Sequence, residues 1–73
     1  MFEKLKALLV DELQIDEDMI TMDAELTKDL NINSIELADL IMMCEEKFGI
    51  SISEEDSNRF LTVGDVVHYL ESL

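Results

Sequence analysis

The residues most able to do chemistry surround one serine, Ser34, at the start of a predicted helix. Asn33 precedes it as a candidate N-cap, and Glu36 stands where a capping box requires its acidic partner. Unpaired N–H groups and the positive dipole end at a helix start favour an anion, so a phosphate esterified to the Ser34 hydroxyl would be stabilised there. Serine and asparagine at this position far more often only cap the helix. The residues alone therefore leave both interpretations open.

The other reactive side chains do not combine into a catalytic or metal-binding set. Cys44 falls in the middle of a predicted helix on its apolar arc, which favours a packed small hydrophobe over a nucleophile. One cysteine and one histidine, His68, cannot form an internal disulfide or a zinc site of Cys and His ligands. The acidic run 16–18 fails the EF-hand pattern at Ile20 and Thr21. We expect no catalytic residue and no metal ligand, and hence no enzyme.

Helical periodicity predicts the elements that position these residues. Met1 to Leu13 and Ser34 to Phe48 carry apolar residues at helical spacing, and a last helix follows the cap Thr62. Short helical turns are predicted over Ser53 to Arg59 and near Ala24 to Lys28. Isolated apolar residues should pin the long first loop across the core: Ile15, Ile20, Leu26 and Leu30. The predicted fold is an all-α, up-down bundle of three longer helices and one short helix.

Length and charge limit the partners of this chain. Its 73 residues are one small domain, and 18 acidic against 5 basic residues give a formal charge of −13. An apolar content of 48% is too high for a disordered polyelectrolyte, whereas the charge would repel nucleic acid and anionic membranes. No stretch resembles a membrane span or a secretory signal. We expect a cytoplasmic protein, without membrane insertion, that exists as a monomer.

The predicted buried face of the Ser34 to Phe48 helix comprises Leu37, Leu40, Ile41, Cys44 and Phe48. A second arc of this helix lies opposite that face. Apolar and acidic residues alternate along it: Ile35, Asp39, Met42 and Glu46. Apolar anchors ringed by acids suit a basic, apolar partner surface. Scattered exposed apolar residues are also normal on a solvated helix. The arc by itself favours neither interpretation.

Two segments carry a family resemblance. Residues 29–37 (DLNINSIEL) and 45–50 (EEKFGI) resemble the acyl carrier protein pattern D-L-G-x-D-S-L, followed by a helix that ends in E-E-x-F. The resemblance continues through Ile52, the acids of 54–56 and residues 62–70, so it covers essentially the whole chain. Length, acidity, helix order and the position of the serine agree with it.

The resemblance implies that Ser34 accepts 4′-phosphopantetheine from coenzyme A and that acyl groups are carried as thioesters on its terminal thiol. The implied pathway is fatty acid or related, polyketide-like biosynthesis. The implied partners are a phosphopantetheinyl transferase and acyl-transferring and chain-elongating enzymes with basic patches. The implied docking residues are Ile35, Glu36, Asp39, Met42, Glu45, Glu46 and Ile52. The candidates to line an acyl cavity are Leu37, Leu40, Ile41, Cys44, Phe60 and Leu61.

Three residues depart from the family pattern. Asn33 replaces the usual Asp and cannot form an ion pair with a modifying transferase. Asn31 stands where Gly is usual, which is tolerable at positive φ, and Ile35 replaces the common Leu. Together they suggest a specialised carrier. Two alternatives stay open: a carrier-like interaction module that is never modified, and a D-alanyl, peptidyl or polyketide carrier.

Overall fold

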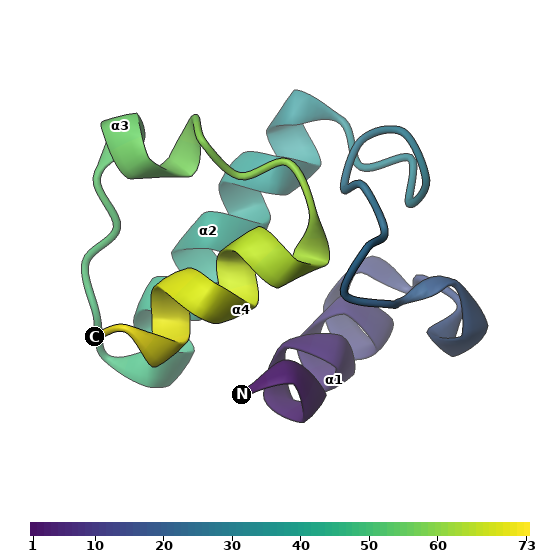
Figure 1. Cartoon of the computed structure of the whole chain (residues 1–73), viewed down its shortest axis with the longest axis horizontal. Coiled ribbons are helices and arrows are strands. Elements are labelled where there is room, and N and C mark those ends of the chain that lie inside the picture. Colours follow the sequence, from purple (N-terminus) through teal and green to yellow (C-terminus); the bar gives the residue numbers. More distant parts are fainter.

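Four α-helices and one 3₁₀ turn form the bundle in the computed structural model, which covers residues 1–73 (Figure 1). They are α1 (Phe2–Leu13), η1 (Glu17–Met19), α2 (Ser34–Phe48), α3 (Glu54–Ser57) and α4 (Val63–Glu71). Helix α1 contacts both α2 and α4, and the β-type pairing is limited to one isolated bridge. The predicted all-α fold of three longer helices and one short helix is confirmed.

Local sequence fixes where the long helices begin and end. Both α2 and α4 begin with capping boxes, the second formed by Thr62 and Asp65. Helix α2 ends at Gly49, which adopts a left-handed conformation with φ 64° that glycine tolerates without a Cβ clash. Helix α1 ends in the same conformation at Gln14, with φ 55°. The ends of the elements are therefore largely encoded in adjacent residues.

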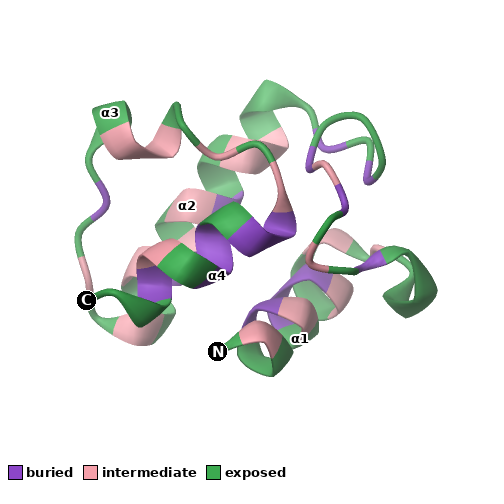
Figure 2. Ribbon diagram, viewed as in Figure 1, coloured by how far each residue is buried: buried purple, intermediate pink, exposed green.

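The core contains only hydrophobic side chains, 15 in number, and no polar side chain is buried (Figure 2). Every long helix contributes to it, and α4 supplies the largest helical share: Val63, Val66, Val67 and Leu70. Helix α2 buries Leu40 and Cys44 fully, whereas the remaining apolar residues of its predicted buried arc are only half-buried: Leu37, Ile41 and Phe48. The prediction of one buried face on α2 is thus correct at its centre and too broad at its edges.

The first loop is part of the core. It buries Ile20, Ala24, Leu26, Leu30 and Ile32, and half-buries Ile15, which confirms that its apolar residues pin it across the bundle. Backbone hydrogen bonds attach the loop to the segment before α4. The Leu26 N–H donates to the Leu61 carbonyl at 2.9 Å, and the Val63 N–H donates to the Ala24 carbonyl at 2.9 Å. The loop and α4 are therefore held together.

The predicted turn of helix near Ala24 to Lys28 is present only as a single turn that starts at Glu25, where the Asp29 N–H donates to the Glu25 carbonyl at 2.9 Å. Glu25 pairs with Thr62 in the isolated bridge, and this extended pairing is incompatible with helix at that point. The chain makes only a turn after Glu25, whose N–H donates to the Asp29 carboxylate at 2.8 Å.

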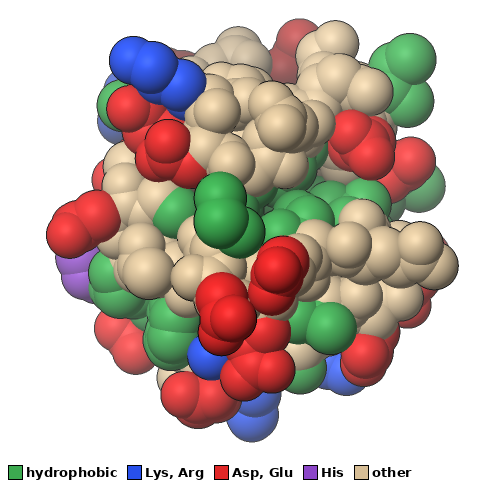
Figure 3. Space-filling model, turned by 90° about the vertical axis from the view of Figure 1, so that its right-hand side faces the viewer, with side chains coloured by type: hydrophobic (Ala, Val, Ile, Leu, Met, Phe, Trp, Pro, Cys, Tyr) green, Lys and Arg blue, Asp and Glu red, His purple; other side chains and the backbone are tan.

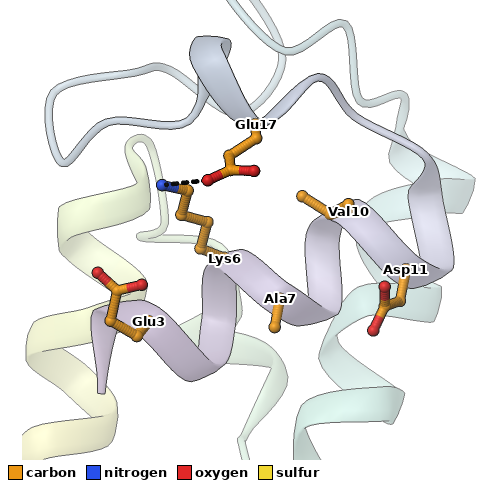
Figure 4. Close-up of a pocket in the computed structure, with 6 residues that line it drawn as sticks. All are labelled: Glu3, Lys6, Ala7, Val10, Asp11 and Glu17. Carbon is orange, nitrogen blue, oxygen red and sulfur yellow. Dashed lines mark ion pairs between the residues drawn. The ribbon is translucent and has the colours of Figure 1, made fainter.

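A 3₁₀ turn lies earlier in the first loop, at η1. Asp16 caps it, because its carboxylate accepts a hydrogen bond from the Asp18 N–H at 3.0 Å. An ion pair of 3.3 Å between Lys6 and Glu17 ties η1 to α1 (Figure 4). These two side chains point toward one another across an open hollow of about 260 Å³. The hollow is far from a closed binding cavity, because it is open to solvent and lined mainly by charged residues.

Candidate functional site

Ser34 is the first residue of α2, and its side chain is exposed to solvent. The Asn33 side chain accepts from the Glu36 N–H at 2.8 Å, and the Glu36 carboxylate accepts from the Asn33 N–H at 3.2 Å. The predicted capping box is therefore present, and it fixes the backbone on both sides of Ser34. The Ser34 hydroxyl takes part in none of the side-chain hydrogen bonds of the protein.

The surroundings of Ser34 fit a phosphodiester. The N–H groups of Ser34 and Ile35 donate no hydrogen bond within the protein, so they remain available at the positive end of the α2 dipole. Asn33 satisfies the Glu36 N–H without adding a negative charge beside Ser34, whereas an aspartate there would add one. A phosphopantetheine phosphate on this oxygen would meet no covering side chain and would extend into solvent.

Asn31, three residues before Ser34, adopts the left-handed conformation with φ 56°. Glycine and asparagine are the residues that reach this region most readily, which accounts for an asparagine at a position where the family usually has glycine. The turn brings the chain to Ile32, which is buried, and its N–H donates to the Leu26 carbonyl at 3.0 Å. The left-handed turn at Asn31 thus places the Ile32 side chain in the core, two residues before the exposed Ser34.

Four of the expected docking residues form an exposed surface on α2. Ile35 and Met42 have 75% and 57% of their surface exposed, and they lie two helical turns apart on the same face of α2. Asp39 lies between Ile35 and Met42 along α2, Glu46 follows Met42, and both acidic side chains are exposed. A pocket of about 270 Å³ lies where α2 meets the end of α1, and its lining includes Asp39, Met42 and Glu46. We call Ile35, Asp39, Met42 and Glu46 the α2 outer face.

The charge around this surface is overwhelmingly negative. On the face of the molecule seen in Figure 3, carboxylates flank a hollow with hydrophobic side chains at its base. The protein has only three ion pairs, one of which uses the amino terminus. Most of its 18 acidic side chains therefore remain without a cation partner and can attract a basic protein.

Three other expected docking residues are engaged inside the protein. Ile52 is buried, with 9% of its surface exposed, so the structure does not place it on a docking surface. The half-buried Glu45 accepts from the Ile52 N–H at 2.8 Å. Glu36 closes the capping box. The sequence pattern predicts this role for Glu36. The bond between the Ile52 N–H and Glu45 was not predicted, because a helical wheel of α2 does not include the backbone that follows the helix.

The candidate cavity residues do not surround an open space. Leu40 and Cys44 are fully buried, whereas Leu37, Ile41 and Phe60 are half-buried. Phe60 lines an open pocket, but the other residues of that pocket come from the segment 56–69 and not from α2. Leu61 does not join them in the core, because 55% of its surface is exposed. Its backbone is instead fixed, since its N–H donates to the Asp65 carboxylate at 2.9 Å and its carbonyl accepts from Leu26.

The cysteine is protected by its position. Burial, with a smaller contribution from the negative charge of Glu45, raises the pKa of the Cys44 thiol to about 11. The thiol is therefore almost entirely protonated at neutral pH, as expected for a packed side chain. No group of three or more His, Cys, Asp or Glu residues is arranged to hold a metal ion, and no helix is long and apolar enough to cross a membrane.

Sequence reasoning missed a contact that fixes α3 against α4. The Tyr69 hydroxyl donates to the Asp56 carboxylate at 3.0 Å, and the Tyr69 ring meets Phe60 edge to face with centroids 5.4 Å apart. This hydrogen bond to a carboxylate raises the pKa of Tyr69. The lone tyrosine was a possible signal, because a half-buried hydroxyl needs a partner.

Comparison with known proteins agrees with this site. A family model described as the phosphopantetheine attachment site matches residues 3–70. An acyl carrier protein from Helicobacter acinonychis is 42% identical over 71 residues, which cover 97% of this chain and 91% of that protein. A solved structure from Mycobacterium tuberculosis, assigned as an acyl carrier protein, superposes with a TM-score of 0.90 at 34% identity, covering 97% and 95% of the two chains. The chain therefore belongs to the acyl carrier protein family, whose members bear phosphopantetheine and act as carriers rather than catalysts.

Proposed function

We propose that Ser34 is the attachment residue and that the protein carries acyl intermediates of fatty acid or related, polyketide-like biosynthesis. The observation that carries this proposal is the exposed, unbonded hydroxyl of Ser34 at the capped start of α2. In the attachment step the Ser34 oxygen loses its proton and bonds to the phosphorus of the phosphopantetheine group, while the phosphoanhydride bond of coenzyme A breaks and adenosine bisphosphate leaves. The product is a phosphodiester anion next to the unpaired N–H groups of Ser34 and Ile35. No rearrangement of the fold is required.

The attached group would supply a terminal thiol for acyl thioesters, while the protein supplies attachment, delivery and recognition. Cys44 cannot substitute for that thiol, because it is buried and its pKa is raised to about 11. The residues of this chain thus serve to present the arm and to keep the only protein thiol out of acyl transfer.

We propose that the α2 outer face docks the partner enzymes, namely the phosphopantetheinyl transferase and the acyl-transferring and chain-elongating enzymes. Ile35 and Met42 offer apolar contact, and Asp39 and Glu46 offer charge to basic patches. A carrier that visits several enzymes needs fast and weak docking, and steering by an acidic surface provides a fast encounter. The sequence prediction of a monomeric, cytoplasmic protein stays a prediction.

Intact mass spectrometry tests the attachment. The protein is incubated with coenzyme A, magnesium and a broad-specificity phosphopantetheinyl transferase, alongside the Ser34→Ala variant and the control Ser51→Ala, which removes another exposed serine. We expect one phosphopantetheinyl mass on the wild type and on the control only. No gain with several transferases, or a gain on Ser34→Ala, would contradict the proposal, and the first result would favour an unmodified docking module.

The same assay tests the docking face when it is run at limiting protein concentration. Met42→Ala should raise the KM of modification, whereas Met19→Ala, which removes a comparably exposed methionine on η1, should leave it unchanged. Higher salt should raise the KM of the wild type, because docking relies on unpaired carboxylates. Equal effects of the two methionine variants would refute docking through the α2 outer face.

Stability measurements on the loaded protein distinguish the kinds of cargo. A D-alanyl or peptidyl group needs no long apolar cavity, so greater stability with longer acyl chains argues for fatty or polyketide-like cargo. Equal stability with acetyl and octanoyl groups would favour the amino acid carriers.

A further inference from the structure

The segment between α2 and α4 is attached to the bundle by few contacts. We call residues 51–60 the strap; Figure 1 shows it as a green arch that leaves after α2, includes α3 and returns before α4. Every backbone-to-backbone hydrogen bond of the strap stays inside the strap. Helix α3 buries no side chain, and Ile52 is the one buried residue of the whole strap.

Two hydrogen bonds to side chains connect the strap to the rest of the protein. The Ile52 N–H donates to Glu45 Oε2 at 2.8 Å, and the Tyr69 hydroxyl donates to the Asp56 carboxylate at 3.0 Å. The ion pair between Arg59 and Glu55 lies within the strap and adds no attachment. Glu45 therefore supplies one of only two such ties, and its tie is at the strap's buried anchor.

The position of the strap determines access to the core from this side. Most candidate cavity residues lie on α2, and Phe60 lies on the strap. Leu40 and Cys44, which are fully buried, belong to the same hydrophobic cluster as Ile52. An acyl chain that reaches this cluster from the side of the strap would displace Ile52 and the backbone that carries it.

We propose that Glu45 is a positioning residue that acts through Ile52: its carboxylate latches the strap onto α2 and so sets how readily the core opens to an acyl chain. The proposal rests on the function proposed above for its cargo. It gives Glu45 a different role from its neighbour Glu46, whose exposed side chain makes no hydrogen bond or ion pair within the protein.

Amide hydrogen exchange of the apo protein tests the latch without any cargo. Removing the carboxylate in Glu45→Ala should speed exchange at the Ile52 amide about tenfold, because the amide loses a charged acceptor and the strap opens more often. Glu45→Gln retains an oxygen acceptor and should lie between Glu45→Ala and the wild type. Glu46→Ala is the matched control and should leave the Ile52 amide unchanged. If the Ile52 amide of Glu45→Ala exchanges at the same rate as in the wild type, the proposal is overturned.

Cargo length separates a latch from a merely structural contact. The holo wild type, Glu45→Ala and Asp11→Ala are loaded with acetyl or octanoyl groups, and their melting temperatures are compared. Asp11→Ala is the control here, because it removes an exposed acid of α1 outside the α2 outer face. With the latch removed, the octanoyl group should raise the melting temperature over acetyl by more than it does in the wild type. An equal increment in all three proteins would overturn the role in cargo access. Failure to load Ser34 would instead refute the proposed function, while the apo exchange experiment would still decide whether Glu45 holds the strap.

Discussion

Replacing Asn33 by alanine removes the side chain that caps α2 next to Ser34. The lost hydrogen bond is short, 2.8 Å from the Asn33 Oδ1 to the Glu36 nitrogen, and it satisfies one of the donors left unpaired at the helix start. The reciprocal bond, from the Asn33 N–H to the Glu36 carboxylate, uses the backbone and remains possible in the variant. The change therefore removes half of the capping box.

The expected loss of stability follows from this geometry. An N-cap asparagine replaced by alanine typically costs about 1 kcal/mol, and the exposed site here lets water replace part of the bond. For a domain of 73 residues, about 1 kcal/mol lowers the melting temperature by roughly 4–8 °C. That loss is substantial against a total stability of about 4–11 kcal/mol.

Thermal unfolding followed by far-UV circular dichroism measures this loss in the apo protein. Asn58→Ala is the matched control, because Asn58 is exposed and its side chain makes no hydrogen bond. Asn33→Asp keeps the acceptor and adds a charge that the helix dipole favours, so it should melt no lower than the wild type. If Asn33→Ala has the same melting temperature as Asn58→Ala and the wild type, the capping box does not stabilise α2.

Three further results are expected. Gly64→Ala should destabilise the protein by about 1–3 kcal/mol in urea unfolding, although alanine normally stabilises a helix, because the new Cβ would lie 2.9 Å from the Met22 carbonyl oxygen; a gain in stability would contradict this. At pH 8 the Cys44 thiol, with its pKa raised to about 11, should react with iodoacetamide on the order of a hundredfold more slowly in the folded protein than in urea, and equal rates would show that it is accessible. Hydrogen bonds from the Thr62 and Leu61 N–H groups lower the pKa of Asp65 in the folded protein. The wild type should therefore be more stable than Asp65→Asn by a constant amount above the unfolded pKa of about 3.9, and this difference should shrink as the pH falls below that value. A difference that does not change with pH would refute the assignment.

The sequence predicted those features that depend on neighbouring residues. Asn33 and Glu36 specify the start of α2, Gly49 specifies its end, and both signals lie within a few positions of the element that they limit. The exposed position of Ser34 follows from the same capping box. The alternation of apolar and acidic residues likewise placed Ile35 and Met42 on an exposed face.

The features that the sequence did not predict depend on distant partners. The turn expected near Ala24 starts only at Glu25 and does not extend into a helix, because Glu25 pairs with Thr62, which lies far along the chain. Ile52 and Glu45 were expected to be docking residues, and the hydrogen bond between the Ile52 N–H and the Glu45 carboxylate was not predicted. Leu61 was expected to line a cavity, but its side chain is exposed while its backbone bonds to Leu26 and Asp65, and hydropathy alone does not reveal these bonds.

The attachment of the first loop to the segment before α4 has a consequence for synthesis on the ribosome. The loop supplies five of the 15 core side chains, yet its backbone partners at residues 61–64 are translated much later. The nascent polypeptide must therefore expose apolar side chains of α1, the loop and α2 until α4 emerges and closes the core. During that interval the excess of carboxylates acts as an internal safeguard, because like-charged nascent segments repel one another and resist aggregation. The acidity that we propose attracts partner enzymes to the finished domain therefore also protects the unfinished one.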